Sequence, residues 1–339
     1  MGTRIALAAG VMAAVLAFAG AAEAQTPQQI ASCEGKTDTP AVRVAGCTAM
    51  INSNKYTGHN LAINFNNRCS AYYDKGDYDL AIQDCNRAIK LDPKYAKPYY
   101  NRSLSWYTKR EYDNAIRDAD EAIRRDSSYA MAYDTRANAY SDKGDHDRAV
   151  RDYNEALRLD PKQPITLSNR CDELAILRQF PAARADCDES LRIRPNHPNT
   201  LKHRAMVHLA LGNLDASLAD YANVLQQTPK DARALYGRGM TKLKKGDIAG
   251  GNEDMASAKA IRENIADMVQ TYGLKAAAAA PASQSQPASA PASDCATAET
   301  HWKSAEEIKT LAVYRDHLAR FPNCAFAALA AARIDALKK

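Results

Sequence analysis

The stretch AINFNNRCSAYYDKGDYDLAIQDCNRAIKLDPKY, residues 62–95, sets a 34-residue pattern that the chain repeats five more times. The later copies start at Ala96, Ala130, Pro164, Pro198 and Ala232, with no insertion between them. Each copy carries an aromatic residue or leucine at its fourth position and small residues at its eighth and twentieth positions. The eighth position holds Cys69, Ser103, Ala137, Cys171, Ala205 and Gly239. A fixed period of this length is typical of a repeat protein that stacks one structural unit per copy into a solenoid.

This spacing resembles the tetratricopeptide repeat, a helix–turn–helix unit. The resemblance covers residues 62–265 and implies an all-α, right-handed solenoid of six repeats, which we place at residues 62–272. Residues 25–61 are expected to form an N-terminal cap, because an end repeat lacks a neighbour on one face. Four copies place glycine at the expected turn between the two helices, and two place arginine there. These turn residues are Gly76, Arg110, Gly144, Arg178, Gly212 and Gly246.

Residues 1–24 have the composition of a secretory signal peptide. A weakly positive start precedes an apolar run at residues 5–22, and Ala22-Glu23-Ala24 has the form of a signal peptidase site. We expect cleavage before Gln25, which leaves a periplasmic or secreted protein; a retained membrane anchor is the alternative. No later stretch is apolar enough to cross a bilayer, so no membrane insertion is expected after cleavage.

The composition changes after the repeats. Residues 273–293 are rich in alanine, proline and serine, which predicts a flexible linker. Residues 294–339 are expected to form a small helical module, with a capping box at Ser304 and Glu307 and a helix break at Phe321-Pro322. The run from Tyr314 onward resembles the helical pairs found as accessory modules in exported bacterial repeat proteins.

The eight cysteines are disulfide candidates in an oxidising compartment. Two pairs share the eighth and twenty-fourth positions of a copy, where two antiparallel helices approach closely enough for a disulfide. Buried free thiols are the alternative. The predicted pairs are Cys33 with Cys47, Cys69 with Cys85, Cys171 with Cys187, and Cys295 with Cys324.

Arginine stands at the seventh position of all six copies and aspartate at the twenty-third. In an antiparallel hairpin these positions lie close together, which predicts a ladder of ion pairs within each repeat or between neighbouring repeats. A track of arginines that binds an anion is the alternative. The arginines are Arg68, Arg102, Arg136, Arg170, Arg204 and Arg238, and the aspartates are Asp84, Asp118, Asp152, Asp186, Asp220 and Asp254.

The resemblance to the repeat family implies that the first helices line a groove for a peptide or partner segment. We expect the groove residues to lie outside the hairpin core and to form a hydrogen-bonding floor rich in tyrosine. For any one of them, an ordinary helix surface is the alternative. The lysine–asparagine set with which some family members hold a C-terminal carboxylate is not reproduced here. The candidate groove residues are Asn66, Tyr73, Lys97, Tyr100, Tyr107, Asn138, Met206, Tyr236 and Met240.

Charge and motifs exclude several classes of function. The net charge of +5 is modest and both signs alternate along the repeats, so we expect no nucleic-acid partner. The chain lacks a phosphate-binding loop, a nucleophile elbow and a zinc-protease motif. His197, His203 and His208 are not spaced to share one helix face, so no metal site is expected there. We therefore expect neither catalysis nor a cofactor.

The sequence favours an exported scaffold that binds a protein or peptide segment in its groove. The main alternative is an accessory or regulatory subunit of a cell-envelope enzyme that acts on the cell wall or on surface polysaccharide. A weaker alternative is enzymatic activity in residues 294–339. The partner, the pathway and the oligomeric state stay open.

Overall fold

The computed structural model describes residues 31–35, 39–273, 302–303, 312, 314 and 327–337. The chain forms two compact units, residues 1–274 and 275–339. The expected signal peptide, nearly all of the expected linker, and the Cys295–Cys324 pair lie outside the described residues. In the second unit, helix α18 spans Ala327–Leu337, and the rings of Trp302 and Tyr314 lie 5.8 Å apart.

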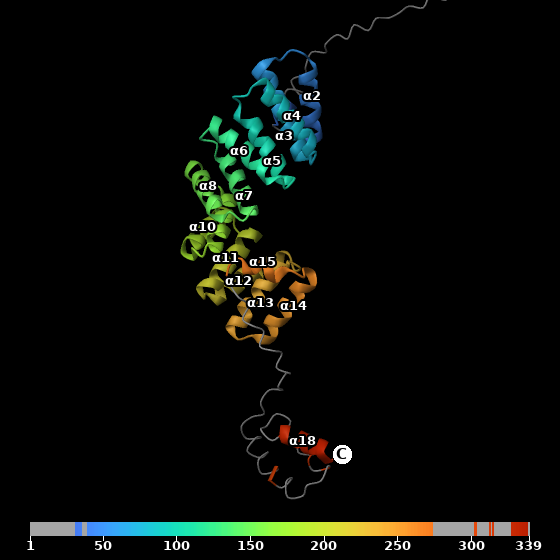
Figure 1. Cartoon of the computed structure of the whole chain (residues 1–339), viewed down its shortest axis with the longest axis vertical. Coiled ribbons are helices and arrows are strands. Elements are labelled where there is room, and N and C mark those ends of the chain that lie inside the picture. The colour runs from blue at the N-terminus through green and yellow to red at the C-terminus, as the bar shows by residue number, and fades with distance from the viewer. Residues whose placement is uncertain are drawn as a thin grey trace, which may run out of the picture. The chain divides into compact units, whose positions relative to one another are not determined.

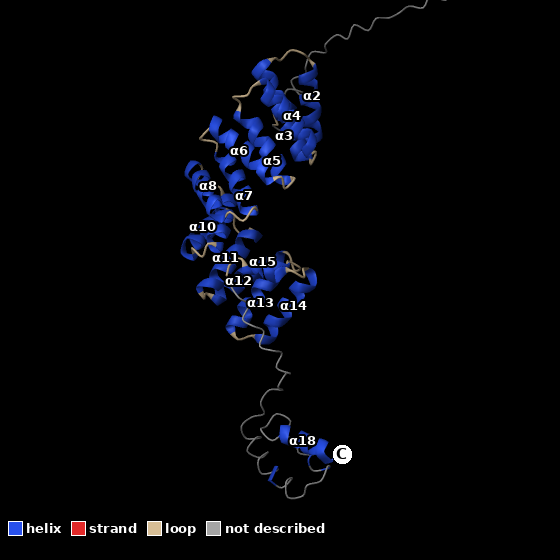
Figure 2. Cartoon of the chain, viewed as in Figure 1, coloured by secondary structure: helices blue, strands red, loops and turns tan. Residues whose placement is uncertain are grey.

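The first unit is an array of six helical hairpins, which confirms the predicted all-α solenoid (Figure 1). No strand occurs among the residues that the structure describes (Figure 2). Helix α2 (Pro40–Asn52) precedes the hairpins, and the short helix α15 (Ile265–Gln270) follows them. The hairpins are α3 (Gly58–Lys75) with α4 (Tyr78–Leu91), α5 (Ala96–Thr108) with α6 (Tyr112–Arg125), α7 (Ala130–Asp142) with α8 (His146–Leu159), α9 (Pro164–Ile176) with α10 (Phe180–Ile193), α11 (Pro198–Leu211) with α12 (Leu214–Gln227), and α13 (Ala232–Lys245) with α14 (Ile248–Ile261).

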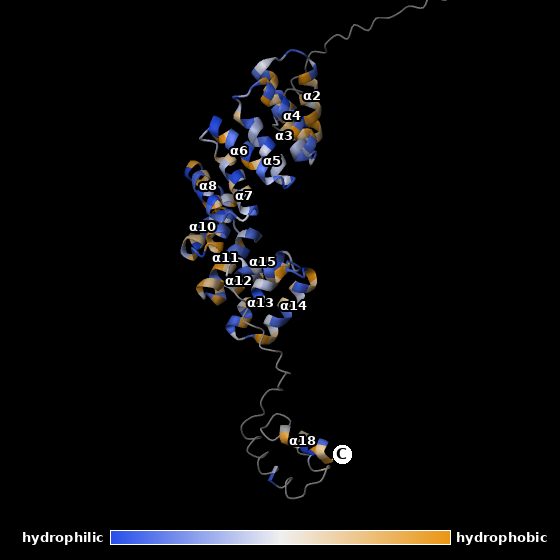
Figure 3. Ribbon diagram, in the orientation of Figure 1, coloured by the Kyte–Doolittle hydropathy of each residue, from blue (hydrophilic) through white to orange (hydrophobic). Residues whose placement is uncertain are grey.

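Small residues bring the two helices of each hairpin together. Ala137 and Ala149 are fully buried in the third hairpin, and alanine or cysteine takes these places in most others. The two helices of the sixth hairpin approach so closely that a Cβ atom added to Gly239 would lie 2.8 Å from the carbonyl oxygen of Gly251. Hydrophobic and hydrophilic residues are interspersed along the helices of the array (Figure 3).

Three of the four predicted cysteine pairs are disulfide-bonded in the structure. The Cα atoms lie 5.5 Å apart in both Cys69–Cys85 and Cys171–Cys187, and 4.5 Å apart in Cys33–Cys47. These separations lie within the range of ordinary disulfides. Two of the bridges join the helices of one hairpin, and the third ties a helical turn at residues 31–33 to α2 of the cap.

All six hairpin turns use one left-handed residue, whether or not it is glycine. Gly76 has φ of 89°, and Arg110 and Arg178 adopt φ of 63° and 61° at the same place. The missing glycines therefore do not change the turn, although a side chain in this region costs about 1–2 kcal/mol.

The first helices form the inner face of the array. Each first helix contacts the first helix of the next repeat, whereas no second helix between α4 and α14 contacts the second helix of its neighbour. This difference bends the array toward α3, α5, α7, α9, α11 and α13. No helix among the described residues is both long and apolar enough to span a membrane.

Candidate functional site

The arginine–aspartate ladder joins the two helices of each hairpin and, from Arg68 to Arg204, also the helix that precedes the hairpin. Arg136 donates from Nε and Nη2 to the carboxylate of Asp152 at 2.7 and 2.6 Å, within its own hairpin. Its Nη1 donates to Asp120 on the preceding second helix. The other arginines from Arg68 to Arg238 make the same bidentate pair inside their hairpins. With their guanidinium groups committed in this way, the ladder sets the register of the array and does not favour the anion-binding track.

The floor of the inner face is buried between the first helices, which corrects the expectation that the groove residues lie outside the core. Tyr100 is only 7% exposed, packs with Tyr99, Ala122 and Ala132, and has its ring 4.9 Å from that of Tyr129. Burial raises the pKa of the Tyr100 phenol. The physical reason is the close contact of neighbouring first helices, which covers most fifth positions and the ninth positions of the last two repeats, whereas Lys97 is exposed and Tyr73, Tyr107 and Asn138 are half-buried. Asn66, Met206, Tyr236 and Met240 are buried there as well.

A column of polar side chains at the sixth position holds the first helices together. Asn101 donates to Oδ1 of Asn66 at 2.9 Å, and Asn169 donates to Oδ1 of Asn138 at 3.0 Å. His203 follows the same rule, donating from Nδ1 to the carbonyl of Ser168 at 3.1 Å. The Oδ1 atoms of Asn66 and Asn138 therefore accept hydrogen bonds from within the protein. Sequence reasoning missed this column, although its spacing of 34 residues was readable.

Two acidic residues, the buried Glu173 and the half-buried Asp134, stand at the boundary of the third and fourth repeats. Glu173 accepts from Ser141 Oγ at 2.5 Å, and its Oε2 lies 2.7 Å from Nδ1 of His146. Asp134 accepts from Thr166 Oγ1 at 2.7 Å. Burial raises the pKa of both carboxyl groups, although these hydrogen bonds oppose the rise. Polar contacts thus join the third and fourth repeats at this boundary.

The accessible part of the inner face lies along its two rims. At the second position of each repeat, Lys97 is exposed, Met131 is 50% exposed and Ile165 is 42% exposed. At the opposite rim, near the turns, four half-buried tyrosines form what we call the tyrosine cluster: Tyr73, Tyr78, Tyr107 and Tyr112.

The tyrosine cluster consists of two ring pairs, one in each of the first two repeats. The rings of Tyr73 and Tyr78 lie 5.7 Å apart, and those of Tyr107 and Tyr112 lie 5.9 Å apart. Burial and the neighbouring carboxylate of Asp142 raise the pKa of the Tyr107 phenol. Each pair joins the end of a first helix to the start of its second helix, so both pairs recur with the repeat.

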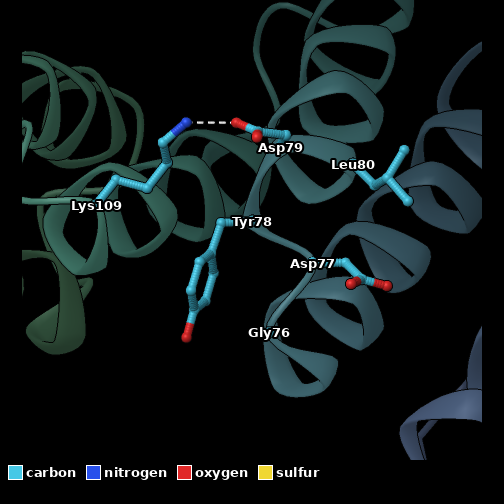
Figure 4. Close-up of a pocket in the computed structure, with 6 residues that line it drawn as sticks. All are labelled: Gly76, Asp77, Tyr78, Asp79, Leu80 and Lys109. Atoms are coloured by element: carbon cyan, nitrogen blue, oxygen red, sulfur yellow. Dashed lines mark hydrogen bonds and ion pairs between the residues drawn. The ribbon is translucent and has the colours of Figure 1, made fainter.

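A cavity of about 300 Å³ lies beside the tyrosine cluster, lined by residues 76–80 and Lys109 (Figure 4). Tyr78 forms one side of it, and an ion pair between Lys109 and Asp79 closes another. The same pair recurs as Lys143 with Asp113 and as Lys245 with Asp215. This second ladder was not predicted, although lysine and aspartate recur at a constant spacing in the sequence.

Toward the C-terminus of the array, the chain folds back and covers part of the inner face. Tyr272, two residues after α15, is buried against Asp172 of α9 and Arg233 of α13. Sequence reasoning missed Tyr272, because no local signal tells that a residue contacts another one 100 positions earlier. No group of three or more histidine, cysteine or acidic residues that could hold a metal occurs within the described part of the chain.

The hairpins and their ladders define a helical repeat solenoid. The floor of its inner face is buried, and the two rims of that face are accessible. Family models described as "Tetratricopeptide repeat" match residues 62–95, 130–163 and 204–254. The chain is a tetratricopeptide repeat protein. As a class, such folds are scaffolds for protein–protein interaction. No curated protein matches the sequence of this chain.

Solved structures share the fold. A tetratricopeptide repeat protein from Parabacteroides merdae is 14% identical, with a TM-score of 0.50, and the match covers 69% of this chain and 93% of that one. The Cut9–Hcn1 hetero-tetramer of the APC/C is 15% identical, with a TM-score of 0.52, over 87% of this chain and 52% of that one. YrrB, described as a TPR protein with an unusual peptide-binding site, is 25% identical over 56% of this chain and 96% of its own, with a TM-score of 0.46.

Proposed function

We propose that this protein is an exported, non-catalytic scaffold that holds a segment of a partner protein against the inner face of its first three repeats. The observation that carries the proposal is the tyrosine cluster. It presents four half-buried rings on adjacent hairpins, beside a cavity and close to the inner face.

Half-buried tyrosines suit this role for a physical reason. Each ring supplies a large apolar contact area with few rotatable bonds, while its hydroxyl group can still form a hydrogen bond. The opposite rim adds the exposed apolar side chains of Met131 and Ile165. Met131 belongs to the third repeat and Ile165 to the fourth, so a segment that lies across the first three repeats would contact tyrosine rings at one rim and Met131 at the other. Lys97 adds one positive charge, which favours a segment with an acidic residue near that rim.

The proposal of export rests on two features that support each other. The signal-like pattern of residues 1–24 predicts an oxidising destination, and three cysteine pairs lie at disulfide distance in the folded repeats. The test is fractionation of a cell that makes the full chain. Export requires a periplasmic or secreted product whose N-terminus is Gln25. A product found in the membrane fraction with Met1 intact would show the retained anchor instead.

The binding face is tested by placing a photo-crosslinking amino acid at position 107. The control is position 133, because Tyr133 is also half-buried but packs on the ladder arginine Arg136. We expect position 107 of the oxidised protein to capture a partner and position 133 to capture none. Equal capture at both positions would contradict the proposal.

The same partner then serves in a binding assay. Tyr107→Ala combined with Tyr112→Ala should weaken capture about tenfold or more, the size that truncated aromatic anchors imply. Tyr133→Ala should leave it within about twofold. If the double variant captures the partner at full strength, the partner binds another face. Recovery of one enzyme of the cell envelope would identify the scaffold as an accessory subunit, whereas recovery of many unrelated segments would indicate a chaperone-like role.

A further inference from the structure

The chain covers part of its own inner face. Residues 265–273, which we call the tail segment, leave the last hairpin and return against the first helix α13. Ile265 and Tyr272 are 0% and 1% exposed, and both belong to the apolar core of the last three repeats. The tail segment therefore covers the inner face of the last repeats with residues of the chain itself.

The phenol of Tyr272 has specific partners there. Its hydroxyl group donates to Oδ1 of Asp172 and accepts from Nη2 of Arg233. The guanidinium carbon of Arg233 also lies 5.5 Å from the ring centroid, a cation–π distance. His203 completes the set, with Nε2 placed 3.6 Å from Oδ2 of Asp172. We call Asp172, His203 and Arg233 the phenol site.

The phenol site is matched to tyrosine and to no other side chain. Tyrosine alone combines an aromatic face for Arg233 with a hydroxyl group that donates to a carboxylate and accepts from a guanidinium group. Phenylalanine would bury the ring but lose the hydroxyl group that bridges Asp172 and Arg233, which would keep only their direct ion pair at 3.5 Å.

The backbone after Tyr272 is also fitted to its surroundings. Gly273 has φ of +65°, and a Cβ atom added there would lie 2.0 Å from Nη2 of Arg178. Because Nη2 is the movable end of a side chain, it is the left-handed φ that favours glycine after the tyrosine, by about 1–2 kcal/mol. The six-residue helix α15 that delivers it is far shorter than a helix that is stable alone, so contacts with the array must hold it in place.

We propose that the phenol site is a tyrosine-binding subsite, which Tyr272 fills from within the chain and which a Tyr-Gly sequence of a partner segment fills when the tail segment leaves. The side chain that the subsite binds is inferred from the tail segment, which places Tyr272 in it. The binding of a partner segment in this subsite rests on the proposed function. The existence of the subsite does not, because the test below uses a peptide and no partner protein.

The probe is a fluorescent peptide with the sequence of residues 263–273, ENIADMVQTYG. The protein is the full mature chain with Tyr272→Ala, which opens the subsite. Fluorescence anisotropy should show the peptide binding at least tenfold more tightly to Tyr272→Ala than to the wild type, where the tail segment competes. Tyr272→Phe keeps the buried ring and loses only the hydroxyl contacts, so it should bind the peptide with an affinity between those of the wild type and Tyr272→Ala, and it serves if the alanine variant melts too low.

Three comparisons make the test specific. A peptide with phenylalanine in place of its tyrosine should lose most of the binding, and so should Asp172→Asn added to Tyr272→Ala. N-acetyl-tyrosylglycinamide in excess should displace the peptide, whereas the phenylalanyl analogue should not. Tyr107→Ala with Tyr112→Ala should leave peptide binding unchanged, which separates this subsite from the tyrosine cluster.

Several results would overturn the proposal. Equal affinity of the peptide for the wild type and for Tyr272→Ala would show that Tyr272 does not block the site to which the peptide binds. Binding that ignores the phenylalanine exchange or Asp172→Asn would show that the phenol is not recognised. A wild-type dimer that Tyr272→Ala abolishes would assign the subsite to the tail segment of a second copy instead of a partner.

Discussion

At the scale of single residues, burial decides which side chains can serve a partner. Tyr100 and Tyr107 occupy similar places in the repeat pattern, yet one lies between two first helices and the other lies at the rim. Glu173 shows the same effect on charge. It is 3% exposed and carries a carboxyl group with a raised pKa where most acidic residues of the chain face water.

The first residue-scale prediction concerns Tyr100. Tyr100→Ala should lower the free energy of unfolding by about 3 kcal/mol, because it removes a buried ring and leaves a cavity beside Tyr129. Lys97→Ala, one turn earlier on the same helix and exposed, should change it by less than about 0.5 kcal/mol. Urea unfolding followed by circular dichroism measures both. Equal urea midpoints for Tyr100→Ala and Lys97→Ala would show that Tyr100 lies on the surface of the groove and not in the core.

The second residue-scale prediction concerns pH. Since burial raises the pKa of Glu173 above its ordinary value of 4.5, the folded state holds this proton more tightly than the unfolded state. Its contribution to stability is therefore fully present below pH 4.5 and is lost as the pH rises through the raised pKa.

Glu173→Gln removes the titration while an amide can still accept from Ser141. We expect the variant to melt higher than the wild type at pH 8 and to gain less at pH 4. Asp147→Asn, an exposed first-turn residue of α8, is the control. The same difference between variant and wild type at both pH values would count against a raised pKa.

At the scale of elements, the ladder explains how short helices keep their register. Every seventh-position arginine from Arg68 to Arg204 bonds its own hairpin and also the preceding second helix. Each arginine thus fixes the position of its hairpin relative to the helix that precedes it. Apolar contacts between alanines could slide by one turn, whereas a bidentate pair has a single geometry.

The element-scale prediction is that Asp152→Ala destabilises the array more than an exposed charge does. Asp152 is 6% exposed, and its removal leaves Arg136 with only Asp120. We expect a loss of about 2–3 kcal/mol, somewhat below the cost of breaking a fully buried pair. Lys162→Ala, in an exposed loop, should cost less than about 0.5 kcal/mol. Equal urea midpoints for the two variants would show that the ladder does not stabilise the fold.

At the scale of the whole molecule, a solenoid has no single core, so its stability is the sum of its hairpins and their boundaries. The disulfides stabilise the first and fourth hairpins and the cap, whereas the second, third, fifth and sixth hairpins contain none. The third hairpin folds with Ala137 at the place of a bridged cysteine, so alanine fits this position.

The whole-molecule prediction concerns these bridges. Peptide mapping without reduction should find Cys69 joined to Cys85 and Cys171 joined to Cys187. Replacing both Cys69 and Cys85 by alanine should cost about 3 kcal/mol, since the bridge closes a short loop. Replacing Ser103 by alanine at the matching place of the second hairpin is the control. Cys69 found joined to any other cysteine would refute the pairing.

The sequence alone determined the repeat, its length, the two helices of each copy and the residues of the ladder. These are periodic, local features, and one stacking geometry satisfies all six copies of Arg68 and Asp84 at once. The positions of the hairpin cysteines follow from the same period.

Only the tertiary structure decided which inner-face residues are accessible. The fifth and ninth positions look like surface in a single hairpin, but the curvature that brings neighbouring first helices together buries Tyr100 and Asn66. The return of Tyr272 to Asp172 has no periodic signal at all. Burial of this kind depends on contacts between residues far apart in the chain, and a repeat pattern carries no information about a contact that occurs once.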